Sequence, residues 1–419
     1  MKSSINFISL VKEYTAATLN EISIDTYIVK GISKDVFPKI PRPQKWVSLW
    51  RKNKFSIYFF YMAAMFFLLS GGAFIYFIFA IVKLYFIDVD DKELLASKRS
   101  YIDKGFELDK IIVGFDYKTY QSAISFYKDT KLCWLSLPWT RFTGHLCHGH
   151  KKISIANFLS FKDYLSIFVL SSLSFFSLVL NRKTISHILQ IYTAPKWFYV
   201  RLALSKVNGH FITTEHMDRW AILMDRLCLS KKTNLTLVQH GSLKALVLPE
   251  NAHFKIYTRL HSVAELVAYD RIESEIFLDK IIRNGKGKAI TLLHMGMQLN
   301  TVKVDNDKFS ILFVGHPHCE DTQIKIYHSL VGLNIIAYYK EHPKAPASRN
   351  VRKIGWVFIN DLKFFPSVDL VISYASTLAY EYESIGAKVL FHDLSTISES
   401  MCSNIVSLIK EEVKNNERK

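Results

Sequence analysis

Four strand-like segments of this chain end in polar residues that could hold a phosphate group. They are "VQHGS", "VGHPH", "YKEHP" and "SYAST". Imidazole, ammonium and hydroxyl groups all donate hydrogen bonds, and the first two can carry positive charge. In parallel α/β sheets, ligands bind beyond the carboxyl ends of the strands. The segments therefore predict a phosphate-containing ligand, and they nominate His240, Gly315, His316, Lys340, His342, Ser373, Ser376 and Thr377.

The segment "SYASTLAYEYESIGA" adds a second reason to expect an anion. Ser376 and Thr377 lie where a strand gives way to a helix. A helix N-terminus presents free N–H groups and a partial positive charge, so it can hold a phosphate. The same residue types also serve as ordinary helix caps. The pattern alone leaves both interpretations open.

The elements that must position these residues follow a β–α–β rhythm. Strand-like runs include "KIIVGFD" and "TKLCWLSLP" in the first half, and "FSILFVGHP", "LNIIAYYKEHP", "DLVISYAS" and "KVLFHD" in the second. Such alternation predicts an α/β fold with parallel sheets covered by helices. We expect an N-terminal segment over 1–100, a Rossmann-like domain over 101–290, a second over 305–396 and a charged helix over 397–419. A polar linker over 284–308 would join the two Rossmann-like domains.

The run from Phe55 to Val82 contains no charged residue and is long enough to span a bilayer. "SGG" at Ser70–Gly72 lies at its middle, and basic residues flank it on both sides. We favour two short helices hinged at these glycines, forming a hairpin that dips into one leaflet. A single tilted span and a buried core hairpin are the alternatives. A second uncharged run, Tyr164–Leu180, is short and rich in serine, which favours a buried or interfacial helix.

Composition limits the partners and the compartment. The chain has 419 residues, 49 % hydrophobic residues and a net charge of +17, and its mean hydropathy is positive. These values favour a globular protein that contacts a membrane and binds anions. No nucleic-acid-binding signature is visible, so we expect no nucleic-acid partner. The five cysteines form no CxxC pair, and no signal peptide is visible. Both features favour the cytosol.

The pair of motifs "YKEHP" and "VDLVISYASTLAYEYESIGAKVLFHD" resembles the HP and Ser-Ser/Thr motifs of bacterial sialyltransferases. Related patterns occur in capsule enzymes that transfer Kdo. The upstream "LVQHGSLKAL" resembles instead the Gln-x-Trp-His-Gly motif of teichoic-acid CDP-glycerol glycerophosphotransferases, without the tryptophan. "ILFVGHPHCED" resembles the glycine turn that opens the donor domain in such enzymes. Together these resemblances cover about residues 235–393.

The resemblance implies the GT-B fold, two facing Rossmann-like domains, and a CMP-activated donor. It implies that His342 contacts the donor phosphate and assists the departure of CMP. Ser376 and Thr377 would bind that phosphate, with Lys340 adding charge nearby. Sialyltransferases also carry an acidic general base in an Asp/Glu-Asp/Glu-Gly motif, which this chain lacks. His240 is our first candidate for the base and Glu215, in "TTEH", the second.

Two further motifs have residue types that could bind a metal ion. "IDVDD" (Ile87–Asp91) contains the Asp-x-Asp of metal-dependent glycosyltransferases, but it follows the apolar run directly, and a solvated helix end is favoured. "HLCHGH" contains His145, Cys147, His148 and His150, whose spacing fits no closed zinc site, so a polar loop is favoured. We therefore expect neither a metal ion nor another cofactor.

The sequence thus predicts a metal-independent, inverting glycosyltransferase of O-antigen or capsule polysaccharide synthesis. It would move a sugar from a CMP-activated donor to a lipid-linked glycan at the cytoplasmic face of the bacterial inner membrane. Transfer of a polyol phosphate from CDP-glycerol or CDP-ribitol is the enzymatic alternative. A membrane-anchored assembly or export factor without catalytic activity is the alternative that is not an enzyme.

Overall fold

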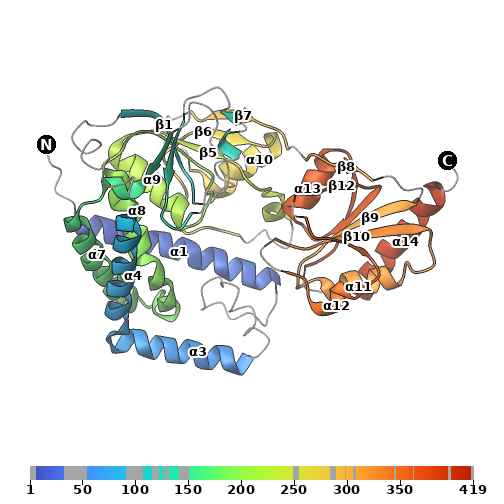
Figure 1. Ribbon diagram of the computed structural model, residues 1–419, viewed down its shortest axis with the longest axis horizontal. Helices are drawn as coiled ribbons and strands as arrows, with labels where there is room; N and C mark the ends of the chain where they lie inside the picture. The colour runs from blue at the N-terminus through green and yellow to red at the C-terminus, as the bar shows by residue number, and fades with distance from the viewer. Residues whose placement is uncertain are drawn as a thin grey trace. The chain divides into compact units, whose positions relative to one another are not determined.

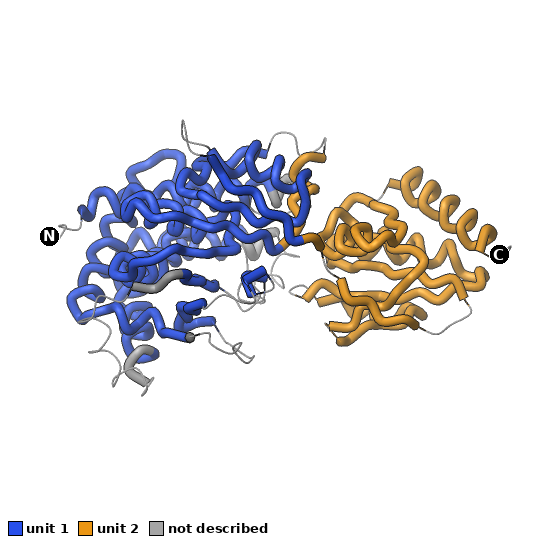
Figure 2. The backbone as a smooth tube through the Cα atoms, turned by 90° about the horizontal axis from the view of Figure 1, so that it is seen from above, with its two compact units in different colours: residues 1–27, 37–240, 253–295 blue, residues 28–36, 241–252, 296–419 orange. Residues whose placement is uncertain are grey.

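A computed structural model describes residues 6–32, 54–90, 107–115, 122–124, 126–127, 132–140, 151–248, 254–283, 289–297, 299–304, 308–343, 346–361, 363–394 and 398–416. The chain divides into two compact units, coloured separately in Figure 2. Unit 1 contains Met1–Tyr27, Phe37–His240 and His253–Met295. Unit 2 contains Ile28–Val36, Gly241–Ala252 and Gly296–Lys419.

Unit 1 is built on a seven-stranded sheet with the order β3-β2-β1-β4-β5-β6-β7. All six neighbouring pairs are parallel. Strands such as β2 and β5 are buried along their whole length, which explains their continuous apolar runs. The strands are β1 (Glu107–Val113), β2 (Cys133–Ser136), β3 (Lys151–Ser154), β4 (Asn208–Thr213), β5 (Leu235–Val238), β6 (Val263–Ala268) and β7 (Thr291–His294).

Helices surround this sheet and extend from it on one side (Figure 1). α7 begins at a capping box in which Ser160 and Asp163 bond each other's backbone N–H groups. α9 begins at Asp218, whose carboxylate accepts from the backbone N–H groups of Trp220 and Ala221. The helices of unit 1 are α1 (Phe7–Ile32, whose last residues from Ile28 are assigned to unit 2), α3 (Lys54–Phe67), α4 (Ala73–Asp90), α7 (Phe161–Leu180), α8 (Ala194–Ser205), α9 (Arg219–Lys231) and α10 (Arg271–Ile276), with shorter turns η1 (Leu68–Gly72), η2 (Ile155–Phe158), η3 (Ile185–Thr193) and η6 (Phe277–Ile281).

Unit 2 is built on a five-stranded sheet with the order β11-β10-β9-β13-β14, and all its pairs are parallel. Its strands are β9 (Phe309–Val314), β10 (Ile335–Lys340), β11 (Val357–Ile359), β13 (Leu370–Ser373) and β14 (Lys388–Phe391). A separate two-stranded sheet pairs β8 (Val302–Lys303) with β12 (Pro366–Ser367). The helices are α11 (Glu320–His328), α12 (Arg349–Arg352), α13 (Thr377–Ser384) and α14 (Glu399–Asn416), with the turn η4 (Lys244–Val247).

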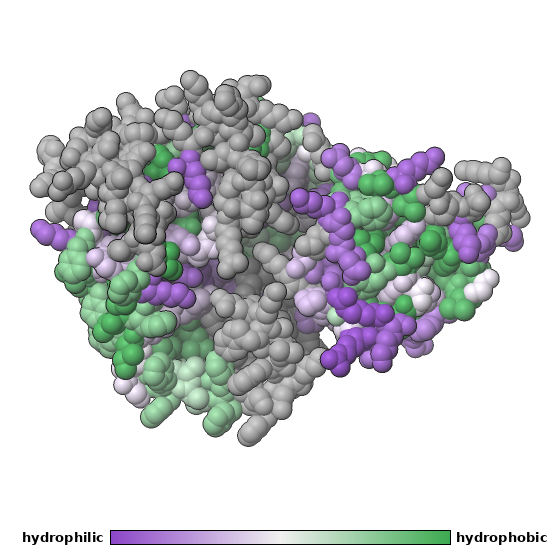
Figure 3. Space-filling model, in the orientation of Figure 1, coloured by the Kyte–Doolittle hydropathy of each residue, from purple (hydrophilic) through white to green (hydrophobic). Residues whose placement is uncertain are grey.

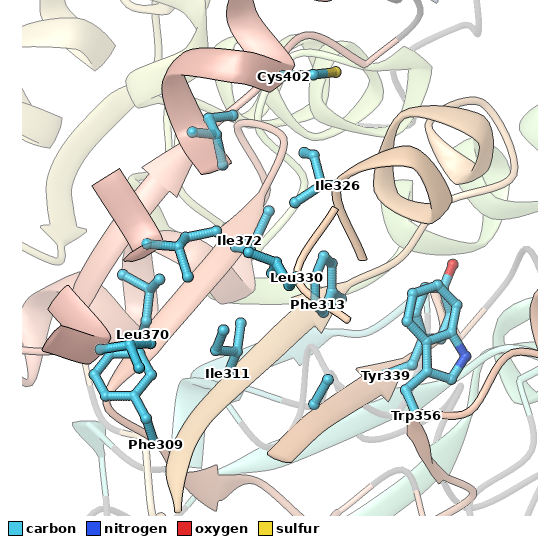
Figure 4. Close-up of a cluster of buried hydrophobic side chains, with 14 of the residues drawn as sticks. Phe309, Ile311, Phe313, Ile326, Leu330, Tyr339, Trp356, Leu370, Ile372 and Cys402 are labelled. Carbon is cyan, nitrogen blue, oxygen red and sulfur yellow. The ribbon is translucent and has the colours of Figure 1, made fainter. Parts of the chain in front are cut away.

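Helices cover both faces of the unit 2 sheet. On one face, Phe309, Ile311 and Phe313 of β9 pack against α11 and α14, as the close-up in Figure 4 shows. On the other face, Leu312 and Val314 pack with Tyr382 of α13. Alternate residues of one strand therefore fill two cores, which is the doubly wound arrangement. The α/β class with two parallel-sheet units, predicted from the sequence, is confirmed.

The apolar run Phe55–Val82 divides at the predicted place. Ser70 and Gly71 have non-helical backbone angles, and Gly71 has a φ of +96°, a left-handed conformation that glycine adopts at least cost. The two helices on either side of this break do not form the expected hairpin, however. α4 packs along α7 instead of folding back on α3, as Figure 1 shows.

The unit boundaries also differ from those expected. The region 284–308, expected to be a linker, contains β7 of the unit 1 sheet and β8 of unit 2. The N-terminal segment is largely part of unit 1, and α14 is part of unit 2. The segment Gly241–Ala252, expected inside the first Rossmann-like domain, belongs to unit 2.

Candidate functional site

The reversal of strand order in unit 2 lies between β9 and β13, which are neighbours in the sheet. Strands on either side of such a point lead their connections to opposite faces, which leaves room for a ligand at the carboxyl edge. β9 ends in Val314 and continues as Gly315 and His316. β13 ends in Ser373. Two of the predicted site segments therefore flank the topological switch point of this sheet.

Aromatic side chains from three strand ends gather at this edge. The His316 ring lies 5.3 Å from the His342 ring and 5.6 Å from the Tyr374 ring, measured between centroids. It also stacks on His318 at 5.0 Å. β9 supplies His316, β10 supplies His342 and β13 supplies Tyr374. The structure thus brings together two histidines that the sequence placed in separate motifs.

The proton of a neutral His316 is fixed by its surroundings. The backbone N–H of His318 donates to Nδ1 of His316 at 3.3 Å. Nδ1 must therefore be the unprotonated nitrogen, and the proton lies on Nε2. The ring can then donate a hydrogen bond from Nε2 to an anionic oxygen.

Gly315 allows the turn after β9 to pass close to the neighbouring strand. A Cβ at this position would lie 2.0 Å from the hydroxyl oxygen of Tyr339 on β10. No side chain fits in that space. The Gly315 backbone N–H also donates to the Lys340 carbonyl at 2.8 Å, which ties the two strand ends together.

Lys340 was expected to bind the donor, but its ammonium group bonds backbone carbonyls inside the protein. It is 6 % exposed, and its ammonium donates to the carbonyls of Asp361 and Phe364 at 3.0 and 2.9 Å. It also lies over the Phe365 ring at 4.5 Å. Burial lowers the pKa of this lysine. The side chain holds the loop after β11 instead of reaching past the strand end.

Ser373 and Ser376 use their hydroxyls inside the protein. Ser373 donates to the Tyr374 carbonyl at 2.7 Å, so Ser376 must be the donor in the 3.0 Å bond between the two hydroxyls. Ser376 Oγ also accepts from the backbone N–H of Ala379, which makes it the N-cap of α13. Helix capping therefore accounts for Ser376, and bonds to Tyr374 and Ser376 account for Ser373.

Thr377 is the first residue of α13, and its side chain is only half-buried. The first backbone N–H groups of a helix have no partner within the helix, and they carry its partial positive charge. At this edge, the groups whose chemistry would suit an anion are thus the start of α13, the Thr377 hydroxyl and the His316–His342 pair.

A segment far away in the sequence joins this edge. A Cβ at Gly241 would lie 3.2 Å from Thr377 Oγ1, so the chain passes very near the start of α13. Three residues later, the Lys244 ammonium lies 5.6 Å from the centroid of the Tyr380 ring, in the first turn of α13. Sequence analysis missed Lys244 as a site residue. The one available signal was its position in "QHGSLK", directly after a predicted strand end.

His240 lies in unit 1, after β5, and is exposed. Its Nδ1 is 2.6 Å from the Thr214 carbonyl oxygen. Because a carbonyl only accepts, Nδ1 carries the proton, and Nε2 of the neutral ring carries the lone pair that can accept one. This tautomer suits a general base, and the geometry resembles that of any imidazole oriented by an acceptor on its other nitrogen.

His216 packs against His240 and accepts a hydrogen bond from its backbone. It is 7 % exposed, and its Nε2 accepts from the His240 backbone N–H at 3.4 Å. The two rings are 4.4 Å apart. Burial, reinforced by the nearby His240, holds the pKa of His216 well below its ordinary value. His216 is therefore a neutral residue that fixes the backbone of its neighbour.

Glu215, the second candidate for the base, lies at the end of β4 between Thr214 and His216 and is half-buried. Its backbone N–H donates to the Thr213 hydroxyl at 3.2 Å. The bonds that orient His240 come from the residues on either side of it. Gln239, also part of the motif, accepts from the Tyr269 backbone N–H at 2.8 Å and joins β5 to β6.

The structure describes only part of the two motifs that could bind a metal ion. "IDVDD" forms the end of α4 up to Asp90, and the side chains of its aspartates are not described. "HLCHGH" lies outside the described residues. Among the residues that the structure does describe, no three His, Cys, Asp or Glu side chains form a group able to hold a metal ion.

No protein-family model matches this chain, and no curated protein sequence matches it. Solved structures similar to it include a histidine-to-asparagine variant of the wall teichoic acid polymerase TagF soaked with CDPG. That chain shows 11 % identity and a TM-score of 0.37, with 81 % of this chain and 88 % of the other covered. Another is the glycosyltransferase VinC in complex with DTDP, at 9 % identity and a TM-score of 0.29, covering 73 % and 95 %. Similarity at this level does not assign an activity.

Proposed function

We propose that this protein is a glycosyltransferase of the GT-B type that uses a cytidine-nucleotide donor. One observation carries the proposal: the His316–His342 pair, the start of α13 and Lys244 all lie at the switch-point edge of the unit 2 sheet. Positive and hydrogen-bond-donating groups at such an edge suit the phosphate of a nucleotide. Negative charge on that phosphate increases when the nucleotide leaves, and the same groups would stabilise it.

The chemistry we propose is a displacement in which CMP is the leaving group. His240 Nε2 takes the proton of the acceptor hydroxyl, whose oxygen forms a bond to the anomeric carbon of the donor sugar. The bond from that carbon to the phosphate oxygen breaks, and the electron pair leaves with CMP. His342 and His316 donate to the phosphate oxygens. The HP and Ser-Thr motifs favour sialic acid or Kdo as the sugar.

Transfer of a polyol phosphate from CDP-glycerol or CDP-ribitol is the second candidate. Here the acceptor oxygen would bond to the outer phosphorus, and CMP would again leave. The observation favouring it is the place of Gly241 and Lys244 beside α13, since these residues belong to the "LVQHGSLKAL" segment that resembles glycerophosphotransferases. A second phosphate would use the additional charge of Lys244.

A thermal-shift series with CMP, CDP, UMP, UDP and GDP tests the nucleotide assignment. We expect saturable stabilisation by CMP and CDP that greatly exceeds that by the uridine and guanosine nucleotides. His342→Asn and His316→Asn should remove it. The matched control is His328→Asn, because His328 is an exposed histidine at the other end of α11 in the same unit. An assembly factor without catalytic activity would show no saturable nucleotide effect.

The two donor chemistries are separated by supplying CMP-sialic acid, CMP-Kdo and CDP-glycerol one at a time. CMP release that requires a lipid fraction from the source cells would identify the donor.

We propose a lipid-linked glycan of O-antigen or capsule synthesis as the acceptor, at the cytoplasmic face of the bacterial inner membrane. The anionic pyrophosphate of such a lipid suits a chain with a net charge of +17.

A further inference from the structure

α4 and α7 form an antiparallel pair on the outside of unit 1. Near the start of α4, Phe74 packs against Phe175 and Phe176 at the end of α7, with ring centroids 5.8 and 6.0 Å apart. Near the other end of α4, Tyr85 packs against Tyr164 at the start of α7, at 5.3 Å. α7 is a 20-residue helix, about 30 Å long at 1.5 Å per residue.

Each helix of the pair buries one face in the protein and leaves the opposite face apolar. In α4, Phe77, Ile81 and Leu84 are buried. In α7, Ile167, Leu170 and Leu178 are buried. The outward face, which we call the α4–α7 surface, consists of Ile75, Ile78, Phe79, Val82, Phe86, Phe161, Leu165, Val169, Leu173, Phe176 and Leu180, all of them exposed. The spacing of three and four residues places each set on one stripe of its helix.

This surface groups eleven exposed apolar side chains on two adjacent helices. Figure 3 shows the apolar side chains, in green, gathered over α4 and α7 at the lower left of the view. Single exposed apolar residues are normal on soluble proteins, but contiguous patches of this kind mark an interaction site. Two stretches are long and apolar enough to cross a membrane by length and composition alone: Tyr58–Ile87, which runs from α3 through η1 into α4, and α7. The first of them is broken at Ser70 and Gly71, and α7 has one face buried in the protein.

The charges at the rim of the surface indicate which partner covers it. Lys83 and Lys162 are exposed beside the apolar stripes, and Arg182 and Lys183 are exposed just after α7. The one acidic residue between Phe161 and Leu180, Asp163, is buried and accepts from Lys206. Between Ala73 and Ile87 there is no acidic residue, and α4 then ends with Asp88 and Asp90. An apolar face with a basic rim is complementary to a bilayer that contains anionic headgroups.

We propose that the α4–α7 surface inserts into one leaflet of an anionic phospholipid bilayer, with both helices lying along the membrane plane. A membrane-spanning helix is surrounded by lipid or by other spanning helices, because polar backbone cannot face hydrocarbon. Here the inner faces of both helices pack on a unit that contains a parallel sheet and its loops. Lipid can therefore reach only the outer stripes. This surface does not depend on the proposed catalytic activity.

Two further bonds hold the helices in place for this role. The Tyr61 hydroxyl of α3 donates to the Ser186 carbonyl, and the Tyr76 hydroxyl of α4 donates to the Tyr192 carbonyl, both at 2.8 Å. α3 adds exposed apolar residues of its own on the other side of the Gly71 turn: Tyr58, Phe59, Met62, Phe66 and Phe67. The apolar face is thus presented by fixed helices attached to unit 1.

Vesicle flotation of the full chain tests the proposal. We expect binding to phosphatidylcholine vesicles that contain phosphatidylglycerol, and weaker binding when salt is raised. Leu165→Glu should reduce the partition coefficient by about tenfold or more, since it places a carboxylate in the buried part of the interface. The control is Ile272→Glu on α10, because Leu165 and Ile272 are 57 % and 58 % exposed in the same unit. Equal binding by the two variants would overturn the proposal.

Depth measurements separate insertion along the plane from spanning. A spin label is placed in turn at Leu165, Leu173 and Leu180, in a background without the native cysteines. All three residues lie on the outward stripe of α7. We expect similar depths at the three positions. A deep centre with shallow ends would mean that α7 spans the bilayer. A lipid-free dimer dissociated by Leu165→Glu would mean that a second copy of the chain covers the surface instead. Either result would overturn the proposal.

Discussion

The backbone N–H of His240 donates to Nε2 of the buried His216, and the two imidazole rings lie 4.4 Å apart. His240 in turn donates its own Nδ1 proton to the Thr214 carbonyl. One histidine therefore serves as a neutral support, while the other has its lone pair on Nε2. The two residues have the same side chain, and burial together with different hydrogen-bond partners separates their roles.

Replacing His216 tests this support. His216→Leu removes the acceptor of the His240 N–H, whereas His216→Gln can offer an amide oxygen in its place. We expect nitrogen NMR of labelled histidines to show His240 with its proton on Nδ1 in the wild type and in the glutamine variant. In the leucine variant that signal should be lost or mixed. Loss of one such hydrogen bond should lower kcat about tenfold without changing affinity for CMP.

The matched control is His261→Leu, a half-buried histidine of unit 1 that precedes β6. It should leave the His240 signal and kcat unchanged. A His216→Leu protein with an unaltered His240 signal would show that His216 only fills space.

Stability should fall in mild acid. Burial lowers the pKa of His210, His216 and His392 in the folded protein, while the unfolded chain titrates near the ordinary value of about 6.5. Above that pH neither state is protonated. Below it, the unfolded state binds protons that the folded state does not, so the free energy of unfolding decreases by up to about 1.4 kcal/mol per pH unit for each of the buried His216 and His392, and by less for the half-buried His210.

Urea titrations of the full chain between pH 7.5 and pH 5 would measure this slope. His216→Gln should make it shallower for unit 1, because one of the titrating groups is gone. Identical slopes in the variant and the wild type would contradict the assignment of His216 as a buried histidine that stays neutral in the folded protein.

Lys340 and His342 are two residues apart but should respond oppositely to substitution. Lys340→Met leaves the Asp361 and Phe364 carbonyls without their donor, and we expect unit 2 to lose about 2–4 kcal/mol. The folded fraction should still bind CMP normally. His342→Asn should keep the stability and lose the binding. Chemical denaturation and calorimetric titration measure the two quantities, and a Lys340→Met protein that is stable but does not bind would restore its predicted donor role.

Gly315 should tolerate no side chain while Tyr339 is present. Gly315→Ala brings a methyl group into the Tyr339 hydroxyl, and overpacking of this kind costs about 1–3 kcal/mol. Tyr339→Ala removes the obstacle, so the double variant should be less destabilised than the sum of the single changes. Additive losses in a double-mutant cycle would show that the two residues do not share this space.

Sequence patterns predicted the parts of this protein that depend on local chemistry. Strand ends follow from buried apolar runs, and the hinge at Ser70–Gly71 follows from glycine's access to a left-handed backbone. The roles of individual polar side chains were harder to predict. Lys340 lies in the same motif as His342. Side chains alternate along a strand, however, and its ammonium group bonds the nearby loop carbonyls instead of a ligand. Nothing in the sequence shows that the hydroxyl groups of Ser373 and Ser376 form a hydrogen bond with each other.

Long-range relationships escaped prediction for a different reason. Gly241 and Lys244 follow β5 of unit 1 directly, and only the folded chain shows that they continue beside α13 of unit 2. In the same way, "TLLH" at Thr291–His294 is a short and largely exposed edge strand, which resembles a linker in composition. The pairing of α4 with α7 joins runs about ninety residues apart that have no complementary pattern.

Hydrogen–deuterium exchange in the presence of CMP tests the central claim most directly, because it reports the backbone of the binding site itself. CMP should protect the amides of Gly315–Glu320, Thr377–Tyr380 and Gly241–Val247, and His342→Asn should abolish that protection. Protection confined to the strand ends of unit 1, such as Thr214–His216, or protection that persists in His342→Asn, would contradict the placement of the donor nucleotide at the switch-point edge of unit 2.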